Sequence, residues 1–419
     1  MFNPNNEWDA PLFKDSLHVM SRSMAPGLSL KEMHYRALKS MATNMNKVGH
    51  TTQSTGLLRW LREFIFLANS IAIYGPINPV VDDPSLVKSL LYVIHPKIYF
   101  PAMKIGFTLT SNRDFEADLP KLVLNLFQPL TASKGYQARQ KFSKAFQNWY
   151  ADGHLEQAGD VVKRQFASNC TKHGLPANTQ ADLEISVLMA GDTNTVPIAF
   201  WLSSHIFADA ELLQDIREEI LHVTKRWTVD GMEMATINFP SLLTECQTLN
   251  SVWLETLRRY NVGLSARMVR EDILLNNTFL LKKNSMLEIP HALIHRNPEI
   301  WGEDALEFKA RRFLDKENTT GKRKKAMMPF GAGTHLCPGR HYVTGVILSL
   351  VAMMVVGFEV TGAEGRKIRI PKQKPLRMTS LGTKPASDIK VVMKRRKDFE
   401  KVQFTFDIGG GITLEDVGE

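Results

Sequence analysis

A glycine-rich loop and a long apolar run meet at one cysteine in this chain. The loop reads FGAGTHLCPGR at residues 330–340, so Cys337 stands directly before a predicted apolar helix. A thiolate at the start of a helix is stabilised by the helix dipole and by free backbone N–H groups, which lower its pKa. The glycines that would allow a flat ligand to approach closely are Gly331, Gly333 and Gly339. Phe330 would shield the sulfur from water, which suits a metal-binding cysteine; a buried structural cysteine is the alternative.

Apolar residues recur at helical spacing through the first two thirds of the chain. The clearest stretches are residues 57–70, 138–151, 182–208 and 242–259. Short β-like runs follow at residues 265–269, 272–281 and 389–394. This pattern predicts a mainly helical fold with small satellite sheets, of the α+β class. Because no linker or composition break occurs, we expect one domain over residues 1–400 and a loose tail over residues 401–419.

Length and composition exclude several classes of protein. The chain has 419 residues, 44% hydrophobic and 23% charged, so it can bury a large core and is neither disordered nor fibrous. Lysine and arginine number 52 and acidic residues 43, and the net charge of +9 is compatible with a basic docking face, a nucleic acid, an anionic membrane or solubility alone. Dispersed basic residues without interleaved aromatics argue against nucleic acid.

Cysteine usage and hydropathy bear on the cellular compartment. The three cysteines, Cys170, Cys246 and Cys337, are too few for a disulfide framework or a zinc site and favour a reducing compartment. The first twenty residues mix charged and apolar residues and predict neither a signal peptide nor a membrane anchor. The apolar run Val343–Phe358 is shorter than the roughly 18 residues of a spanning helix, so we expect a buried core helix. Peripheral contact with a membrane stays open.

Two further motifs are ambiguous on pattern alone. Glu255 and Arg258 lie three residues apart and share a helix face, where an ordinary exposed pair contributes at most about 0.5 kcal/mol. Residues 190–197, AGDTNTVP, place glycine, asparagine and proline inside a helical pattern. Such residues weaken the hydrogen-bond ladder and predict a kink or groove, and a kink that serves packing alone is the alternative.

Together these motifs resemble the cytochrome P-450 monooxygenases. The cysteine loop matches that family's haem-binding pattern FxxGxxxCxG in its aromatic residue, both glycines and the cysteine. Glu255 and Arg258 match the family's ExxR motif. The segment FKARRF at residues 308–313 matches the next motif in Arg312 and Phe313, but has alanine and arginine where proline and glutamate are usual. The resemblance runs from about residue 57 to residue 396 and implies the family's fold without its N-terminal part.

The resemblance implies a haem cofactor and assigns residues to it. Cys337 would be the axial thiolate ligand of the iron. Glu255, Arg258 and Arg312 would form a structural network that braces its loop. The residues expected to contact haem are Cys337, Phe330, Gly331, Gly333, His335, Gly339, Arg267 and Arg36. Of these, His335 stands where an arginine usually pairs with a haem propionate, and Arg267 and Arg36, or His34 in place of Arg36, are the other predicted propionate contacts.

The helix over residues 182–208 resembles the family's oxygen-binding helix. Thr193 and Asn194 align with the acid and threonine that relay protons to bound dioxygen, and they are the predicted catalytic residues. The sequence NTVPIAFW at residues 194–201 resembles the branch with the bile-acid sterol hydroxylases, prostacyclin synthase and fungal enzymes of secondary metabolism. The predicted substrate pocket is mostly apolar or small and comprises Met189, Ala190, Val262, Gly263, Leu264, Ser380 and Leu381.

The resemblance also implies a reaction and partners. A haem-thiolate monooxygenase inserts one oxygen atom from O2 into a lipophilic substrate such as a terpenoid, a steroid or a polycyclic secondary metabolite. Its electrons would come from an NADPH-cytochrome P-450 reductase, steered by the basic cluster at residues 322–325. The expected location is the cytoplasmic side of the endoplasmic reticulum, or the cytoplasm if the chain has no anchor. Two alternatives remain, a reductase-independent haem-thiolate isomerase or dehydratase and an inactive haem-binding protein that lacks its N-terminal part.

Overall fold

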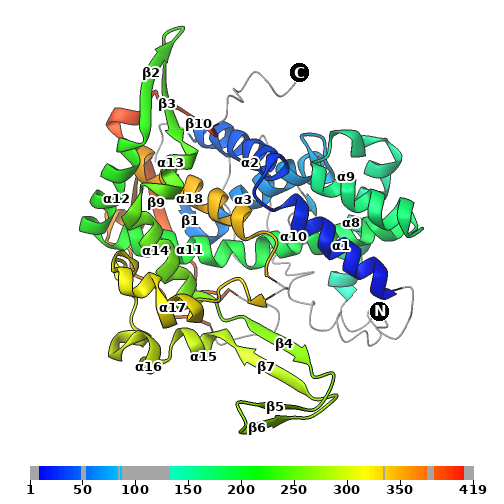
Figure 1. Ribbon diagram of the computed structural model, residues 1–419. Helices are drawn as coiled ribbons and strands as arrows, with labels where there is room; N and C mark the ends of the chain where they lie inside the picture. The colour runs from blue at the N-terminus through cyan, green and yellow to red at the C-terminus, as the bar shows by residue number, and fades with distance from the viewer. Residues whose placement is uncertain are drawn as a thin grey trace.

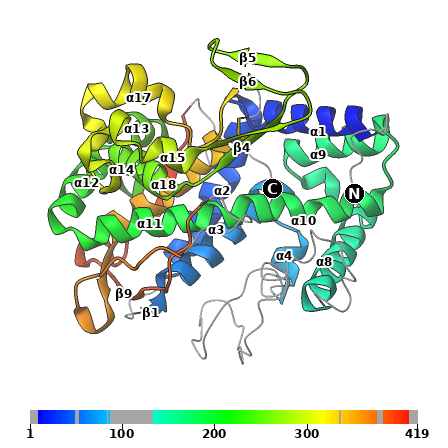
Figure 2. The same cartoon turned by 90° about the horizontal axis from the view of Figure 1, so that it is seen from below.

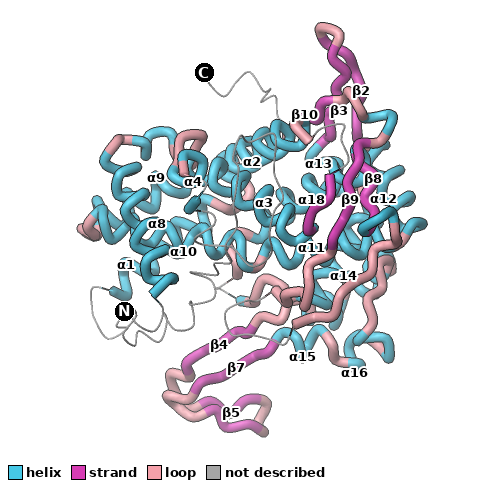
Figure 3. Tube along the Cα trace, turned by 180° about the vertical axis from the view of Figure 1, so that it is seen from behind, coloured by secondary structure: helices cyan, strands magenta, loops and turns pink. Residues whose placement is uncertain are grey.

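Helices form the body of the molecule in the computed structural model, and strands lie along one side and in two projecting hairpins (Figure 1, Figure 3). The structure describes residues 9–48, 53–83, 85–86, 133–333, 336–374 and 382–409. This architecture is the mainly helical fold with small sheets that the sequence pattern predicts.

Long helices from the first half of the chain pack side by side. They are α1 (Asp9–Ser23), α2 (Leu28–Asn46), α3 (Leu57–Tyr74) and α8 (Ser133–Ala151), with the shorter α4 (Pro79–Asp82) and α9 (Asp160–Phe166). The apolar stripe of α3 is buried through Leu61, Ile65 and Ile73. Since α2 and α10 (Ala177–Thr193) both pack on α3, this helix lies between two parts of the core.

The helix predicted over residues 182–208 is divided at Asn194. α10 ends at Thr193 and α11 covers Thr195–Ala208, with Asn194 at φ −100° and ψ −36° between them. Pro197 has no amide hydrogen, so it cannot donate to the carbonyl of Thr193, and the helical ladder is interrupted there. The predicted kink is therefore confirmed, and it falls within the motif that suggested it.

α18 (Arg340–Gly357) is the central helix of the core. Every residue from Gly345 to Gly357 is buried. Among the described residues it is the one helix long and apolar enough to span a membrane, and 78% of it is buried inside the protein. The predicted core helix is thus present. Around α18 and α11 pack α12 (Ala210–His222), α13 (Phe239–Thr244) and α14 (Gln247–Tyr260).

Short helices connect α14 to the cysteine loop. They are α15 (His291–His295), α16 (Pro298–Trp301) and α17 (Gly321–Ala326), with 3-10 turns at Glu303–Leu306, Arg312–Leu314 and Lys316–Thr319. Further 3-10 turns lie at His154–Gln157, Ala363–Gly365 and Lys397–Phe399, and a π-helix over Ala167–Lys172 follows α9.

Two small antiparallel assemblies flank the helices. β1 (Gln53–Gly56) pairs with β9 (Lys390–Arg395), which pairs in turn with β8 (Phe358–Gly362). In register, Ser54 lies opposite Val392 and Val360 opposite Met393. The lower hairpin of Figure 1 consists of β4 (Leu264–Met268) paired with β7 (Met286–Pro290), extended by β5 (Ile273–Leu275) paired with β6 (Phe279–Leu281).

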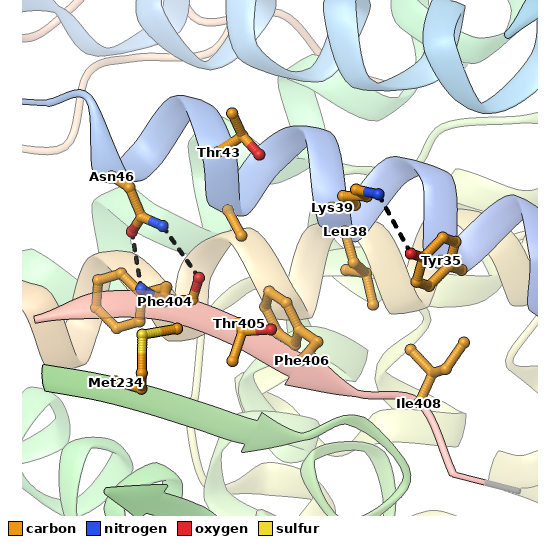
Figure 4. Close-up of a pocket in the computed structure, with 11 residues that line it drawn as sticks. Tyr35, Leu38, Lys39, Thr43, Asn46, Met234, Phe404, Thr405, Phe406 and Ile408 are labelled. Carbon is orange, nitrogen blue, oxygen red and sulfur yellow. Dashed lines mark hydrogen bonds between the residues drawn. The ribbon is translucent and has the colours of Figure 1, made fainter. Parts of the chain in front are cut away.

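The third sheet corrects the prediction for the C-terminus. β10 (Gln403–Asp407) runs parallel to β3 (Met232–Asn238), which pairs antiparallel with β2 (Thr224–Val229). The loose tail predicted from residue 401 is therefore wrong for residues 403–407. Phe404 and Phe406 are buried and hold the strand against the core. At the outer edge of the sheet, the Asn46 amide donates to the Phe404 carbonyl (3.1 Å) and accepts from the Phe404 N–H (2.8 Å). Both backbone groups of this edge residue are therefore hydrogen-bonded (Figure 4).

Candidate active site

The backbone of the cysteine loop is folded back on itself. The N–H of Cys337 donates to the Phe330 carbonyl oxygen at 2.9 Å. Gly331 and Gly333 have φ values of 87° and 70°, in the left-handed region that favours glycine. The Phe330 side chain packs against the main core. These features present Cys337 at the start of α18.

The Cys337 thiol lies where a metal-binding thiolate is stabilised. Gly339 and Arg340 follow it at the start of α18, and the Arg340 N–H donates to the Cys337 carbonyl oxygen at 3.4 Å. Burial raises the pKa of the Cys337 thiol, whereas the backbone N–H groups of Gly339 and Arg340 and the positive charge of Arg340 lower it. The residue still exposes surface that a ligand can reach. Because a coordinating metal ion deprotonates a thiol, this exposed cysteine at the start of a helix fits the iron of haem.

Two polar side chains hold the segment before the loop. Asn261, directly after α14, donates from Nδ2 to the Pro329 carbonyl at 2.5 Å. The N–H of Met328 donates to His295 Nε2 at 3.0 Å. Burial lowers the pKa of His295 to about 4, so the ring is neutral at pH 7 and can accept this bond. The loop is therefore anchored from both α14 and α15.

Arg267 of β4 reaches the cysteine loop itself. Its NH2 group donates to the Ala332 carbonyl at 3.3 Å, and its NH1 group donates to the Ala266 carbonyl at 2.8 Å. The structure therefore brings Arg267 and the loop together. Its contact with a haem propionate stays a prediction.

Arg36 has its partners, among the described residues, outside the cysteine loop. Its guanidinium forms an ion pair with Glu32 at 2.5 Å and donates to the Gln157 carbonyl at 2.8 Å. Neither partner belongs to the cysteine loop. Arg36 and Glu32 lie one helical turn apart on the same face of α2, so they meet each other there. His34 of the same helix faces α18 and lies with Nε2 3.2 Å from the Tyr342 carbonyl oxygen. The propionate contact predicted for Arg36 stays a prediction.

Glu255, Arg258 and Arg312 form a buried ionic network. Arg258 donates from Nε to Glu255 Oε2 at 2.7 Å and from NH2 to Oε1 at 2.8 Å, and Arg312 Nε lies 3.2 Å from each carboxylate oxygen. Glu255 and Arg258 are 0% exposed, so they are not the exposed surface pair that the pattern alone allowed. Arg258 also donates to the backbone carbonyls of His295, Ala305 and Glu307. The network ties α14 to α15 and to the segment that leads to the loop.

The break at Asn194 lies close to Gly382. A Cβ atom added to Gly382 would lie 3.0 Å from the Asn194 carbonyl oxygen. Gly382 also forms an isolated β-bridge with Asn261. Trp201 of α11 stacks on Tyr260 with ring centroids 4.2 Å apart. Gly382 thus connects the break at Asn194 with Asn261, which directly follows α14.

The remaining predicted residues differ in exposure. Met189, Thr193 and Gly263 are buried, Val262 and Asn194 are half-buried, and Ala190 and Leu264 are exposed. The Thr193 hydroxyl donates to the Met189 carbonyl of its own helix. His335, Ser380 and Leu381 lie outside the described residues.

Asp192 is a buried carboxylate for which the sequence suggested no role. It is 0% exposed, and Arg62 Nε of α3 lies 3.6 Å from its Oδ2. Neither of its oxygens accepts a hydrogen bond from the part of the chain that the structure describes. Burial raises the pKa of Asp192 to about 6, although the charge of Arg62 acts to lower it. A carboxyl group that can change charge near neutral pH therefore stands two residues before the break at Asn194.

A buried amide connects the helix that begins beside the cysteine with the helix that ends at the break. The Tyr342 hydroxyl donates to Asn69 Oδ1 at 3.0 Å, and Asn69 Nδ2 donates to the Gly191 carbonyl at 3.2 Å. Asn69 and Tyr342 are 4% and 6% exposed. Because a buried polar group without a partner is costly, this bridge fixes α18 relative to α10.

Replacing the central amide tests the bridge. We expect Asn69→Leu to lower the free energy of unfolding by about 2–3 kcal/mol, because it leaves the Tyr342 hydroxyl and the Gly191 carbonyl buried without this partner. Tyr342→Phe should cost about 1 kcal/mol by itself and almost nothing in the Asn69→Leu background. Urea denaturation of the unmodified protein, the two single variants and the double variant gives the coupling free energy between the two side chains. Strictly additive losses would contradict the bridge.

Sequence reasoning missed Asn69, Tyr342, Asn261 and His295. One signal for Asn69 was present, since this amide interrupts the apolar stripe of α3 formed by Leu61, Ile65 and Ile73. A polar residue on a buried stripe needs a partner, and the partner lies in a distant segment. The sequence offered no comparable signal for Asn261 or His295, whose acceptors and donors are backbone groups.

A groove elsewhere on the molecule does not belong to this site. It lies between α2 and the edge of β10 and has a volume of about 190 Å³ (Figure 4). Its walls include Leu38, Thr43, Met234 and Phe406. None of its lining residues comes from the cysteine loop or from the break at Asn194.

Comparison with known proteins agrees with this geometry. The profile of the family described as cytochrome P-450 matches residues 102–389. The chain is 27% identical over 413 residues to a cytochrome P-450 monooxygenase of Gibberella zeae and 26% identical over 403 residues to the cytochrome P-450 monooxygenase nodJ of Hypoxylon pulicicidum, and each match covers 94% of this chain and 73% of the relative. It is 24% identical over 377 residues to a cholesterol 7-alpha-monooxygenase of Cricetulus griseus, covering 85% of this chain and 68% of that protein.

An accessible thiol at a helix start, a glycine-rich loop and a broken helix with a polar residue at the break define a haem-thiolate enzyme. The chain belongs to the cytochrome P-450 family. Its cofactor is haem, and it is an oxidoreductase of the monooxygenase class.

Proposed function

We propose that this chain inserts one oxygen atom from O2 into a lipophilic substrate, a terpenoid, a steroid or a polycyclic secondary metabolite. The observation that carries the proposal is the exposed Cys337 between a glycine-rich loop and the start of α18. We also propose that residues 1–400 form one haem-binding domain.

Within this proposal, each residue of the site has a distinct task. Bound haem supplies the activation of dioxygen and the oxidation of an unactivated C–H bond. Cys337 would ligate the iron, and Phe330 would keep water from its sulfur. Arg267 and His335 would hold the propionates, while Gly331, Gly333 and Gly339 would admit the flat ring. Thr193 and Asn194 would hold and pass protons at the break in the helix.

The proposed substrate class follows from the residues around the break. Met189, Ala190, Val262, Gly263 and Leu264 carry no charge and are apolar or small. One relative is named a cholesterol 7-alpha-monooxygenase, which supports a bulky apolar substrate. We expect sterols and polycyclic terpenoids to shift the haem absorption spectrum in titrations, and small carboxylic acids to leave it unchanged. A shift caused by the acids alone would contradict this substrate class.

The electron source separates the proposed reaction from its alternative. Asn194 stands where the family usually has threonine, a difference compatible with an isomerase or dehydratase that needs no reductase. Incubating the protein with substrate, with and without NADPH and a cytochrome P-450 reductase, distinguishes the two. We expect product only with both additions and with O2. Product formed from an oxygenated lipid without NADPH would favour the isomerase.

A basic cluster on α17 is the proposed docking site for the reductase. Lys322, Lys324 and Lys325 are exposed, whereas Arg323 is held by the Ile300 carbonyl and the Asn318 side chain. Opposite charges steer association more strongly at low salt. The three lysines would therefore speed the association of an acidic partner. We propose that the protein meets this partner at the cytoplasmic side of the endoplasmic reticulum.

Charge reversal tests this docking site. We expect Lys322→Glu/Lys324→Glu/Lys325→Glu to slow haem reduction about tenfold at low ionic strength and to flatten its dependence on salt. Stopped-flow reduction by the reductase measures both effects. Lys390→Glu/Lys394→Glu reverses two exposed charges on β9 and serves as the control. Equal reduction rates in the triple variant and the unmodified protein would remove α17 from the proposal.

A further inference from the structure

Two aromatic side chains from neighbouring helices stack face to face in the core. Trp201 of α11 and Tyr260, the last residue of α14, have ring centroids 4.2 Å apart and ring planes 5° apart. They are 0% and 4% exposed, and α11 packs beside α14 (Figure 2). Tryptophan and tyrosine are the aromatic residues that lose an electron most easily. Because their rings overlap here, an electron can pass directly from one to the other.

The Tyr260 hydroxyl has a base beside it. Nε2 of His205 lies 2.7 Å from the Tyr260 oxygen. Burial raises the pKa of the Tyr260 phenol, so the phenol keeps its proton at pH 7. Burial, together with the charge of Arg259, lowers the pKa of His205 to about 3, so the imidazole is neutral. A neutral imidazole with its proton on Nδ1 accepts a hydrogen bond at Nε2, and we assign this tautomer to His205.

The His205 ring is held in position for this role. It stacks on Phe308, with ring centroids 3.4 Å apart and ring planes 9° apart. Phenylalanine is much harder to oxidise than tyrosine, so an electron vacancy that reaches Tyr260 does not continue to Phe308. His205 is half-buried, whereas Trp201 and Tyr260 are buried. A proton that moves to His205 is therefore close to water.

The stacked pair adjoins both parts of the candidate active site. Trp201 follows Asn194 by seven residues, which is roughly 10 Å along a helix. Tyr260 precedes Asn261, whose side chain donates to the Pro329 carbonyl oxygen before the cysteine loop. Electrons tunnel through protein over distances of this order, so Trp201 need not touch the haem to exchange an electron with it.

We propose that Trp201, Tyr260 and His205 form a redox relay that removes oxidising equivalents from the haem when no substrate accepts them. In each passage, Trp201 gives one electron to the oxidised haem and receives one electron from Tyr260. The phenolic O–H bond breaks, its proton moves to His205 Nε2, and a neutral tyrosyl radical remains. A thiol in solution then gives the radical one hydrogen atom, and His205 releases its proton to water. The relay needs bound haem but not the proposed oxygenation of a substrate.

A second group of the same residue types provides a matched control. Tyr74 is 0% exposed and donates to Glu184 Oε2 at 2.8 Å, so it too is a buried phenol beside an acceptor. However, it meets Trp149 edge-on, with ring centroids 5.8 Å apart and ring planes at 86°. Because these rings do not overlap, Tyr74 should not take part in the relay.

Freeze-quench electron paramagnetic resonance tests the relay. The haem-loaded protein, without substrate, is mixed with m-chloroperbenzoic acid, an organic peracid that oxidises haem. We expect a tyrosyl radical signal, which ring-deuterated tyrosine should narrow. Tyr260→Phe keeps the stack but removes the hydroxyl, so it should lower the radical yield about tenfold. Tyr74→Phe should leave the yield unchanged.

Two further variants separate electron and proton transfer from packing. Trp201→Phe keeps an aromatic ring against Tyr260 but is much harder to oxidise, so the tyrosyl signal should form about tenfold more slowly. His205→Gln keeps a hydrogen-bond acceptor but not a base, and it should lower the radical yield about as much as Tyr260→Phe. Unchanged signals in these variants or in Tyr260→Phe, or a loss confined to Tyr74→Phe, would overturn the relay.

The haem spectrum of each sample separates the relay from the proposed function. The red-shifted Soret band of the reduced protein with carbon monoxide reports thiolate ligation, which the relay variants leave in place. A protein that has this band but forms no tyrosyl radical with the peracid overturns the relay and not the proposed site.

Discussion

The Cys337→Ala protein is expected to lose the strongly red-shifted Soret band that reduced, carbon monoxide-treated protein shows when a thiolate ligates haem iron. The expected loss is complete, because Cys337 is the sole cysteine of the loop and stands at the start of α18. Alanine removes the ligand but keeps the loop's backbone hydrogen bonds, so the fold should survive. The absorption difference spectrum and the far-ultraviolet circular dichroism of the same sample measure the two effects.

A second cysteine provides the control for this experiment. Cys170 is a partly exposed free cysteine in another part of the chain, and Cys170→Ala should leave the red-shifted band in place. Cys337→Ser separates the sulfur from the size of the side chain, and it too should lose the band. A band that persists in Cys337→Ala would mean that another residue binds the iron and would withdraw the proposed site.

The second large effect is expected at the buried network. Glu255→Gln leaves the guanidinium groups of Arg258 and Arg312 without the carboxylate between them, and breaking one partner of a buried ion network costs about 3–5 kcal/mol. We therefore expect the midpoint of chemical denaturation to fall sharply, and haem to be released more readily, since the network supports the segment before the loop. Equilibrium unfolding in urea and haem transfer to apomyoglobin measure the two effects.

A surface pair gives the matched comparison. Arg226 and Glu233 also form an ion pair, at 2.8 Å, but their side chains are 44% and 51% exposed. Glu233→Gln makes the same chemical change as Glu255→Gln and should cost less than about 1 kcal/mol. Equal losses in the two variants would show that burial of Glu255 does not matter to stability.

Local pattern was sufficient for much of the fold and for the centre of the site. The periodicity of apolar residues predicted α3, α8 and α14, because a helix face repeats within a few residues and needs no knowledge of its partner. The glycines and Cys337 of the loop were found for the same reason. Their spacing is fixed by backbone geometry within eleven residues of chain, and Pro197 likewise determines the break at Asn194 from within its own helix.

Residues that depend on distant partners were predicted less well. Arg36 has a helix position compatible with several partners, and only packing beside Glu32 and Gln157 decides which of them it meets. From its sequence, β10 was predicted to be part of a loose tail. In the structure it pairs with β3, and Asn46 of α2 hydrogen-bonds to Phe404. Short strands of this kind have no stability of their own, so sequence gives little sign of them.

For this protein, the sequence by itself determined the helical framework, the cysteine at the start of α18, and the break in the long helix, since each follows from residues close together in the chain. Only the tertiary structure decided that Glu255 and Arg258 are buried and that Asn69 links Tyr342 to Gly191. Only it decided that the leucines of β5 and β6 remain exposed. The physical reason is that burial and pairing of a side chain depend on residues that are distant in sequence. Periodicity and backbone freedom depend only on residues that are close together in the chain.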